Sequence, residues 1–327
     1  MSRPSPINRV TMGPMANRRT VQLDRPLDVV GTLRLLNRGP WDPTIRLSPR
    51  VVERASHTPE GPAAIRVDID GGTVRAEAWG PGADRLLDGL PAFLGLDDDP
   101  AGFEPGLHRL IADLARRRPG LRLGRTGSVF EALVPAVLEQ RITGLEAFRA
   151  YRRLILAHGA PPPGPTGLWA PPSGAVIAAL PSFAFPPLGI EPRRGALLRR
   201  IGAEAARLEA IAGPARGPNA GGSGSAELAA RLRRYAGIGP WTAAEVTTRA
   251  LGDPDAVSVG DAHLSNLVGF ALAREPRATD ERMLELLAPW AGHRQRVIRL
   301  LESSGIAAPR YGPRIPPRDL RELARRA

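Results

Sequence analysis

Residues 228–264 read LAARLRRYAGIGPWTAAEVTTRALGDPDAVSVGDAHL, in which a glycine turn separates two helical patterns. The apolar spacing of the first helix stops at Gly237-Ile238-Gly239. Pro240 follows directly and fits the first turn of a second helix, where its missing N–H costs nothing. Glycines let the backbone turn tightly and present bare N–H groups, beside a helix N-terminus, to a phosphate. The stretch therefore predicts either a phosphate-binding helix-hairpin-helix or an ordinary helical hairpin.

Asp261 lies further along the same stretch, at a Gly-Asp step where another apolar-periodic helix begins. The simplest role for an Asp at this position is to cap the helix, by accepting hydrogen bonds from the free N–H groups of its first turn. A carboxylate held at a helix end can also act in catalysis. The residues by themselves leave both roles open.

The whole segment resembles the helix-hairpin-helix DNA glycosylase superfamily, in its 3-methyladenine glycosylase II (AlkA-like) branch. Gly237–Ala243, Arg249–Ala256 and Asp261 match this branch in residue and spacing. The resemblance covers most of the chain, and the stretches that open the family's helical domain have counterparts in Gly120–Arg122, Phe130–Val134 and Gln140–Thr143.

This resemblance implies a monofunctional base-excision enzyme. It would hydrolyse the N-glycosidic bond of flipped-out alkylated purines, such as 3-methyladenine and 7-methylguanine, and leave an abasic site. Asp261 would be the catalytic carboxylate, which stabilises the positive charge that develops on the sugar. Two alternatives stay open: a glycosylase for another lesion, such as hypoxanthine or a bulky adduct, and a non-catalytic helix-hairpin-helix DNA-binding protein.

The resemblance also assigns residues to the base pocket. Trp241 and Trp290 would stack against a cationic base, although each could instead be a plain core residue. Glu245 stands where the branch often has an aromatic residue, so its carboxylate could favour a cationic base, read an amino group or lie on a solvated face. Gln140 would hydrogen-bond near the lesion or the opposite strand.

Other residues would contact the DNA outside the pocket. Arg141, with Ile142 beside it, matches the wedge that fills the gap left by the flipped base, and its alternative role is phosphate binding. The hairpin would contribute Gly237, Ile238, Gly239 and Thr242. The resemblance further implies a monovalent cation bound by backbone carbonyls of the Tyr235–Gly239 turn, and no organic cofactor.

Composition limits the chemistry that is available. All 45 basic residues are arginines, because the chain contains no lysine, and the net charge is +12. This charge favours a polyanion such as DNA, although a GC-rich genome would explain the arginines equally well. Without lysine, the Schiff base that a lysine-dependent glycosylase/lyase forms is impossible. The chain has no cysteine and its five histidines lack metal-ligand spacing, so we expect neither an iron–sulfur cluster nor a metal site built from side chains.

The pattern along the 327 residues predicts a mainly α-helical fold, made of helix-hairpin-helix glycosylase domains preceded by a small antiparallel α+β domain. We expect a disordered tail over residues 1–20, the α+β domain over 21–105, and a helical region over 106–327. The helical region would form two subdomains around an active-site cleft, with a flexible loop at 213–225. A β-hairpin is expected around Gly71-Gly72, and one long helix over residues 192–211.

No apolar run is long enough to cross a membrane and the first residues do not resemble a signal peptide. The expected protein is a cytoplasmic monomer whose partner is double-stranded DNA with damaged bases.

Overall fold

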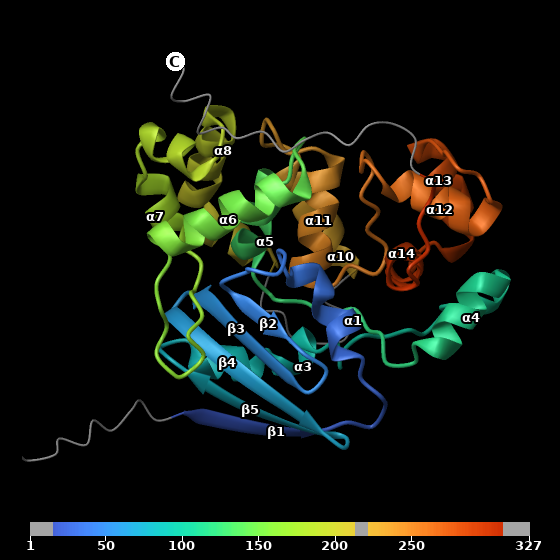
Figure 1. Cartoon of the computed structure of the whole chain (residues 1–327), viewed down its shortest axis with the longest axis horizontal. Helices are drawn as coiled ribbons and strands as arrows, with labels where there is room; N and C mark the ends of the chain where they lie inside the picture. Colours follow the sequence, from blue (N-terminus) through green and yellow to red (C-terminus); the bar gives the residue numbers. More distant parts are fainter. Residues whose placement is uncertain (1–15, 213–221, 310–327) are drawn as a thin grey trace, which may run out of the picture.

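The computed structural model describes residues 16–212 and 222–309, and it places a small sheet below a larger group of helices (Figure 1). The strands are β1 (Asn17–Gln22), β2 (Ile45–Leu47), β3 (Val51–Thr58), β4 (Gly61–Asp70) and β5 (Thr73–Trp79). They form one antiparallel five-stranded sheet in the order β1-β5-β4-β3-β2. The predicted fold class, mainly helical with a small N-terminal antiparallel sheet, is confirmed.

The helices are α1 (Val29–Leu33), α2 (Ala83–Asp88), α3 (Leu90–Phe93), α4 (Arg109–Arg117), α5 (Val129–Leu138), α6 (Gly144–His158), α7 (Gly174–Ala179), α8 (Pro192–Ala203), α9 (Ala205–Ala212), α10 (Gly222–Leu232), α11 (Pro240–Leu251), α12 (Leu264–Ala273), α13 (Asp280–Leu287) and α14 (Arg294–Ser303). Short 3₁₀ turns are η1 (Arg34–Leu36), η2 (Pro105–Leu107), η3 (Ser182–Ala184), η4 (Pro186–Leu188) and η5 (Ala288–Trp290). None of the helices in the described parts of the chain has the length and apolar character needed to cross a bilayer.

The hairpin predicted at Gly71-Gly72 joins β4 to β5. Both glycines have positive φ, +51° and +93°, which suits the tight turns that fit the twist of two antiparallel strands. The tail predicted for residues 1–20 is too long, because β1 begins at Asn17 and pairs with β5 along its whole length. The strand reads NRRTVQ, with one apolar residue, so it lacks the apolar/polar alternation that marks a strand in the sequence. Residues 1–15 lie outside the described part of the chain.

Apolar side chains on one face of the sheet pack against α1, α2 and α3. This core includes Val29, Val52, Val67, Val74, Leu90 and Phe93. This core also packs against Leu36 of η1, the turn that follows α1 and contacts α11.

The helical part contains two cores. The larger one surrounds α5, in which Glu131 is the one residue that is not buried. Glu131 accepts hydrogen bonds from Arg54 Nη2 at 2.6 Å and from His57 N at 2.6 Å, and so it ties α5 to β3. The N-terminus of α5 is capped from a distance by Glu209 on α9, which accepts from the first two N–H groups of the helix.

The smaller core joins α4, α12, α13 and α14. It lies at the right of Figure 1, beside α11. The segment between α11 and α12 therefore runs from one core to the other, and this segment carries Asp261.

Two local predictions need correction. The single helix expected at 192–211 is broken at Glu204, where α8 ends and α9 begins. The flexible loop expected at 213–225 is shorter at its end, since α10 begins at Gly222. Residues 213–221 lie outside the described part of the chain.

Buried arginines join the N-terminal region to the last helices. Arg296 on α14 makes a two-pronged ion pair with Asp98, at 2.7 and 2.8 Å, and both side chains are less than a tenth exposed. Arg299 donates from Nη2 to the carbonyl of Gly31 at 2.7 Å. These long side chains fix the distance between regions that are far apart in the sequence.

Candidate active site

The predicted hairpin lies between α10 and α11, and its glycines are exposed. Gly237 has a φ of +101°, a conformation that favours glycine. The side chain of Ile238, 5% exposed, is anchored in the larger core and fixes the turn from below. Within the described residues, no group accepts a hydrogen bond from the N–H of Gly237 or Gly239. The turn therefore presents free donors at the N-terminus of α11, as phosphate binding requires.

Two side chains hold the carbonyl side of this turn. Gln140 Nε2 donates to the Gly237 carbonyl at 2.9 Å and to Thr242 Oγ1 at 3.0 Å. Arg200 Nη2 donates to the Ala236 carbonyl at 2.6 Å. The carbonyls of Ala236 and Gly237, which belong to the turn where a monovalent cation was expected, therefore already accept hydrogen bonds from side chains, and the cation stays a prediction.

Asp261 has its two carboxylate oxygens held by different parts of the chain. Oδ1 accepts from the N–H groups of His263 at 2.8 Å and Leu264 at 3.0 Å, at the start of α12. Oδ2 accepts from the indole Nε1 of Trp241 at 3.0 Å. The residue as a whole is half-buried. Asp261 therefore caps α12, one of the two roles left open by the sequence, and Trp241 sets the orientation of its carboxylate toward the hairpin; the catalytic role stays a prediction.

Glu245, one turn after Trp241 on α11, does not present a free carboxylate. Its Oε2 pairs with Arg249 Nη1 at 2.5 Å and its Oε1 accepts from Ser258 Oγ at 2.6 Å. Arg249 Nε in turn donates to the carbonyl of Leu35 in η1 at 3.0 Å. Burial lowers the pKa of the Arg249 guanidinium, but nearby carboxylates, first that of Glu245, outweigh burial and leave the pKa raised. Glu245 therefore tethers the segment that leads to Asp261.

Several predicted site residues are buried or have polar partners within the protein. Trp290 is 5% exposed, belongs to the smaller core and donates from Nε1 to the Glu104 carbonyl at 2.9 Å, so it is a core residue. The side chains of Ile238 and Thr242 are buried, which leaves only their backbone for DNA contact. Gln140 uses its amide nitrogen on the hairpin and supports it instead of facing a base.

Arg141 and Ile142 form the turn between α5 and α6. Arg141 is exposed and has a φ of +53°, an uncommon conformation for a residue with a side chain. Arg194 fixes this turn at its base by donating to the Gln140 carbonyl. The Arg141 side chain therefore projects from a well-supported turn, as either a wedge or a phosphate ligand would.

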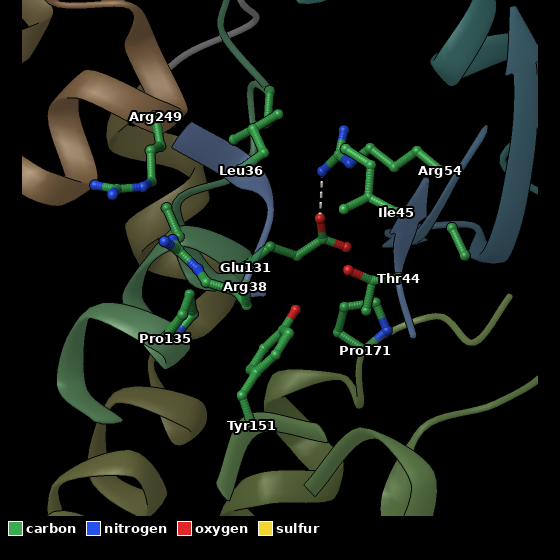
Figure 2. Close-up of a pocket in the computed structure, with 13 residues that line it drawn as sticks. Leu36, Arg38, Thr44, Ile45, Arg54, Glu131, Pro135, Tyr151, Pro171 and Arg249 are labelled. Carbon is green, nitrogen blue, oxygen red and sulfur yellow. Dashed lines mark hydrogen bonds and ion pairs between the residues drawn. The ribbon is translucent and has the colours of Figure 1, made fainter. Parts of the chain in front are cut away.

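A small cavity lined by both charged and apolar residues lies between the sheet and the helices (Figure 2). Figure 2 shows Arg54 directed at Glu131 across it, with Tyr151 and Thr44 below. Arg249 is one of the residues that line this cavity, whereas Asp261 and Trp241 do not line it. Within the described residues, no group of three or more His, Asp or Glu side chains is placed to hold a metal ion.

Solved structures with the same architecture cover almost the full chain. A 3-methyladenine DNA glycosylase from Archaeoglobus fulgidus superposes with a TM-score of 0.73 at 19% identity, over 87% of this chain and 97% of that one. The chain has the helix-hairpin-helix DNA glycosylase fold. An 8-oxoguanine glycosylase/lyase from Clostridium acetobutylicum, solved with DNA containing cytosine opposite 8-oxoguanine, has the same glycosylase fold with a TM-score of 0.65 at 12% identity, over 88% of this chain and 96% of that one.

Sequence comparison finds two curated relatives, from two strains of one organism, with the same name and the same degree of similarity. A Mycobacterium tuberculosis protein named "Probable bifunctional transcriptional activator/DNA repair enzyme AlkA" is 29% identical over 186 residues. The match spans 54% of this chain and 33% of that protein. No family model matches the sequence.

Three residues of this site escaped the sequence analysis: Arg200, Arg249 and Ser258. Arg249 enters the sequence analysis only as part of a motif. It follows Glu245 by four residues, and this i,i+4 spacing is the signal for an ion pair on one helix face. Nothing in the local pattern marked Ser258 or Arg200, because their partners lie on other segments.

We expect Trp241→Phe to slow base release about 10- to 100-fold while DNA affinity changes little. The substitution keeps an aromatic ring but removes the N–H bond to Asp261, and a hydrogen bond to a charged group is worth roughly 1.5–3 kcal/mol. Single-turnover rates with saturating enzyme measure the effect.

Trp290→Phe is the matched control, because it removes an indole bond to a carbonyl in the core. It should lower the melting temperature and leave the single-turnover rate near that of the unaltered protein. Equal rates for Trp241→Phe and the unaltered protein would contradict a positioning role for Trp241.

Proposed function

We propose that this protein is a monofunctional DNA glycosylase that hydrolyses the N-glycosidic bond of alkylated purines in double-stranded DNA. The observation that carries the proposal is the pairing of Trp241 with Asp261 directly beside a hairpin whose N–H groups are free. A carboxylate fixed next to a phosphate-binding turn can reach the sugar of a nucleotide swung out of the duplex. The names of the structural relatives, which include a 3-methyladenine glycosylase, support the same chemistry.

The reaction breaks the C1′–N bond and adds water at C1′. As the bond lengthens, positive charge builds on the sugar, and the Asp261 carboxylate stabilises that charge. Water then bonds to C1′, and its proton passes to Asp261 or to solvent. A purine alkylated on a ring nitrogen is cationic and leaves as a neutral base, so the enzyme does not need to protonate it strongly. The products are the free base and an abasic site.

The hairpin and Arg200 would bind the DNA backbone. The N–H groups of Gly237 and Gly239 would hold a phosphate, with the guanidinium of Arg200 close to the turn. Arg200 would thereby provide the positive charge for which a monovalent cation was expected.

Lyase chemistry by a lysine amine is excluded for this chain, since it has no lysine. The position after Pro240 in the hairpin is occupied by Trp241, whose indole cannot form a Schiff base. We therefore propose hydrolysis alone, by a protein that acts as a monomer.

A panel of oligonucleotides tests the lesion assignment. We expect release of 3-methyladenine and 7-methylguanine, slower or no release of hypoxanthine and 8-oxoguanine, and no covalent DNA–protein product after borohydride reduction. Release of hypoxanthine or 8-oxoguanine alone would make the alkylpurine assignment wrong. Tight DNA binding with no base released from any member of the panel would favour a non-catalytic DNA-binding protein.

A further inference from the structure

Trp41 lies in the loop between η1 and β2, and its side chain is exposed to solvent. The proposed base excision gives no reason for this exposure. It is 64% exposed, whereas the other four tryptophans of the chain are buried or half-buried. A single exposed apolar residue on a mobile loop would need no explanation. The loop that carries Trp41 is, however, firmly built.

Asp42, the neighbour of Trp41, anchors this loop. Its Oδ2 accepts from the N–H of Arg38 at 2.7 Å, and its Oδ1 accepts from Thr44 N at 2.8 Å and Thr44 Oγ1 at 2.7 Å. Asp42 and Thr44 are buried, and prolines flank the pair Trp41-Asp42 on both sides. An aromatic ring on such a support loses little conformational entropy when it binds a partner.

The Trp41 loop lies against the turn that carries Arg141. Arg38 Nη1 pairs with Glu139 Oε1 at 3.2 Å, and Glu139 ends α5 just before that turn. Gly39 packs against Phe148 on α6 so closely that a Cβ at Gly39 would stand 2.8 Å from Phe148 Cδ2. Trp41 is therefore a neighbour of the first turns of α6.

The exposed edge of α6 at this place is basic and partly apolar. Leu145, Arg149 and Arg152 are exposed, and their spacing puts them on one face of the helix with Phe148. The structure pairs neither Arg149, Arg152 nor the nearby Arg141 with any carboxylate among the described residues. Guanidinium groups without a carboxylate partner, on a helix next to the loop of an exposed aromatic ring, suit a nucleic-acid strand: the guanidinium groups can bind its phosphates and the ring can stack on its bases.

We propose that Trp41 is a second DNA contact, on whose ring an unpaired nucleobase stacks while Arg149 and Arg152 bind the adjoining phosphates. This proposal rests on the proposed function, because it assumes that the hairpin and Arg141 bind the same DNA molecule that Trp41 contacts. It assigns to the N-terminal region a role in binding that the catalytic carboxylate does not require.

The test compares two undamaged labelled duplexes, one fully paired and one with a single extrahelical thymine, by fluorescence anisotropy. Trp41→Ala should weaken binding of the duplex with the extrahelical base at least about fivefold, because stacking on an aromatic side chain is worth roughly 1–3 kcal/mol per base. Binding of the paired duplex should change less than about twofold. Trp41→Phe should retain most of the affinity for the extrahelical base.

Phe183→Ala is the matched control. Phe183 is an aromatic residue in η3 that is 76% exposed, and its removal should leave both affinities unchanged. The melting temperature of each variant verifies that the fold is intact. Equal losses on the two duplexes, or no loss on either, would overturn stacking by Trp41. A change of self-association measured by light scattering, with no change of DNA affinity, would overturn it in favour of a contact between protein copies.

Failure of this proposal is separable from failure of the proposed function, since affinity for undamaged DNA and release of damaged bases are independent measurements. A protein that excises alkylpurines but binds both duplexes equally well with or without Trp41 retains the proposed function and loses this contact. A protein that excises nothing but needs Trp41 for the extrahelical base retains this contact.

Discussion

Asp261→Asn should reduce single-turnover base release by about 10²–10³-fold or more, while DNA binding and the melting temperature stay close to those of the unaltered protein. The amide keeps the size of the side chain and can still cap α12 through its oxygen, while its nitrogen then faces the indole N–H of Trp241 and that bond is lost. It removes the negative charge that would stabilise the developing sugar cation, and preorganised electrostatic groups of this kind contribute effects of that size. Release of 3-methyladenine from methylated DNA measures the rate.

Asp28→Asn gives a matched control for this substitution. Asp28 also caps a helix, accepting from Gly31 N at 2.8 Å, but it lies at the start of α1. Its amide variant should excise bases at the normal rate. If Asp261→Asn were equally active, the carboxylate would be a helix cap only, and the proposed mechanism would have to be abandoned.

Asp98→Ala should destabilise the protein by about 3–5 kcal/mol, because removing one partner of a buried ion pair leaves the other charge uncompensated. The lost carboxylate binds Arg296 through both oxygens and also accepts from Leu123 N at 3.0 Å. Thermal or urea unfolding followed by circular dichroism measures the change.

Glu60→Ala is the control for Asp98→Ala, since Glu60 makes a similar two-pronged contact with Arg85 at the exposed surface. Exposed ion pairs contribute roughly 0–1 kcal/mol, so this variant should unfold almost normally. Replacing Asp98 and Arg296 together by apolar residues should recover much of the stability. Equal stability of Asp98→Ala and Glu60→Ala would mean that the buried pair does not hold the regions together.

Features determined by neighbours in the sequence were predictable. The glycine hairpin, the β4–β5 turn and the position of Asp261 at a helix start each depend on a few consecutive residues, and the structure contains all three. Turn conformations and helix starts are local properties of the backbone, so spacing alone indicates them.

Features that depend on distant partners were not predictable. Trp290 was expected in the pocket, but a carbonyl 186 positions away takes its N–H and the smaller core covers its ring. The environment of Glu245 is only half visible in the sequence: its i,i+4 spacing from Arg249 indicates an ion pair, but nothing marks Ser258 as the partner of its other oxygen. The break at Glu204 likewise reflects packing of two helices against α5, since the apolar spacing itself continues through it.

The contact of Arg249 with the Leu35 carbonyl has an evolutionary consequence. The sheet-bearing region is not an independent module attached to a finished enzyme, because its backbone supplies an acceptor to the network that ends at Ser258, close to Asp261. A recombination event that exchanged this region for an unrelated one would leave the Nε of Arg249 without its acceptor, even if the hairpin, the carboxylate and the ion pair with Glu245 were inherited intact. The two halves are therefore constrained to be inherited together.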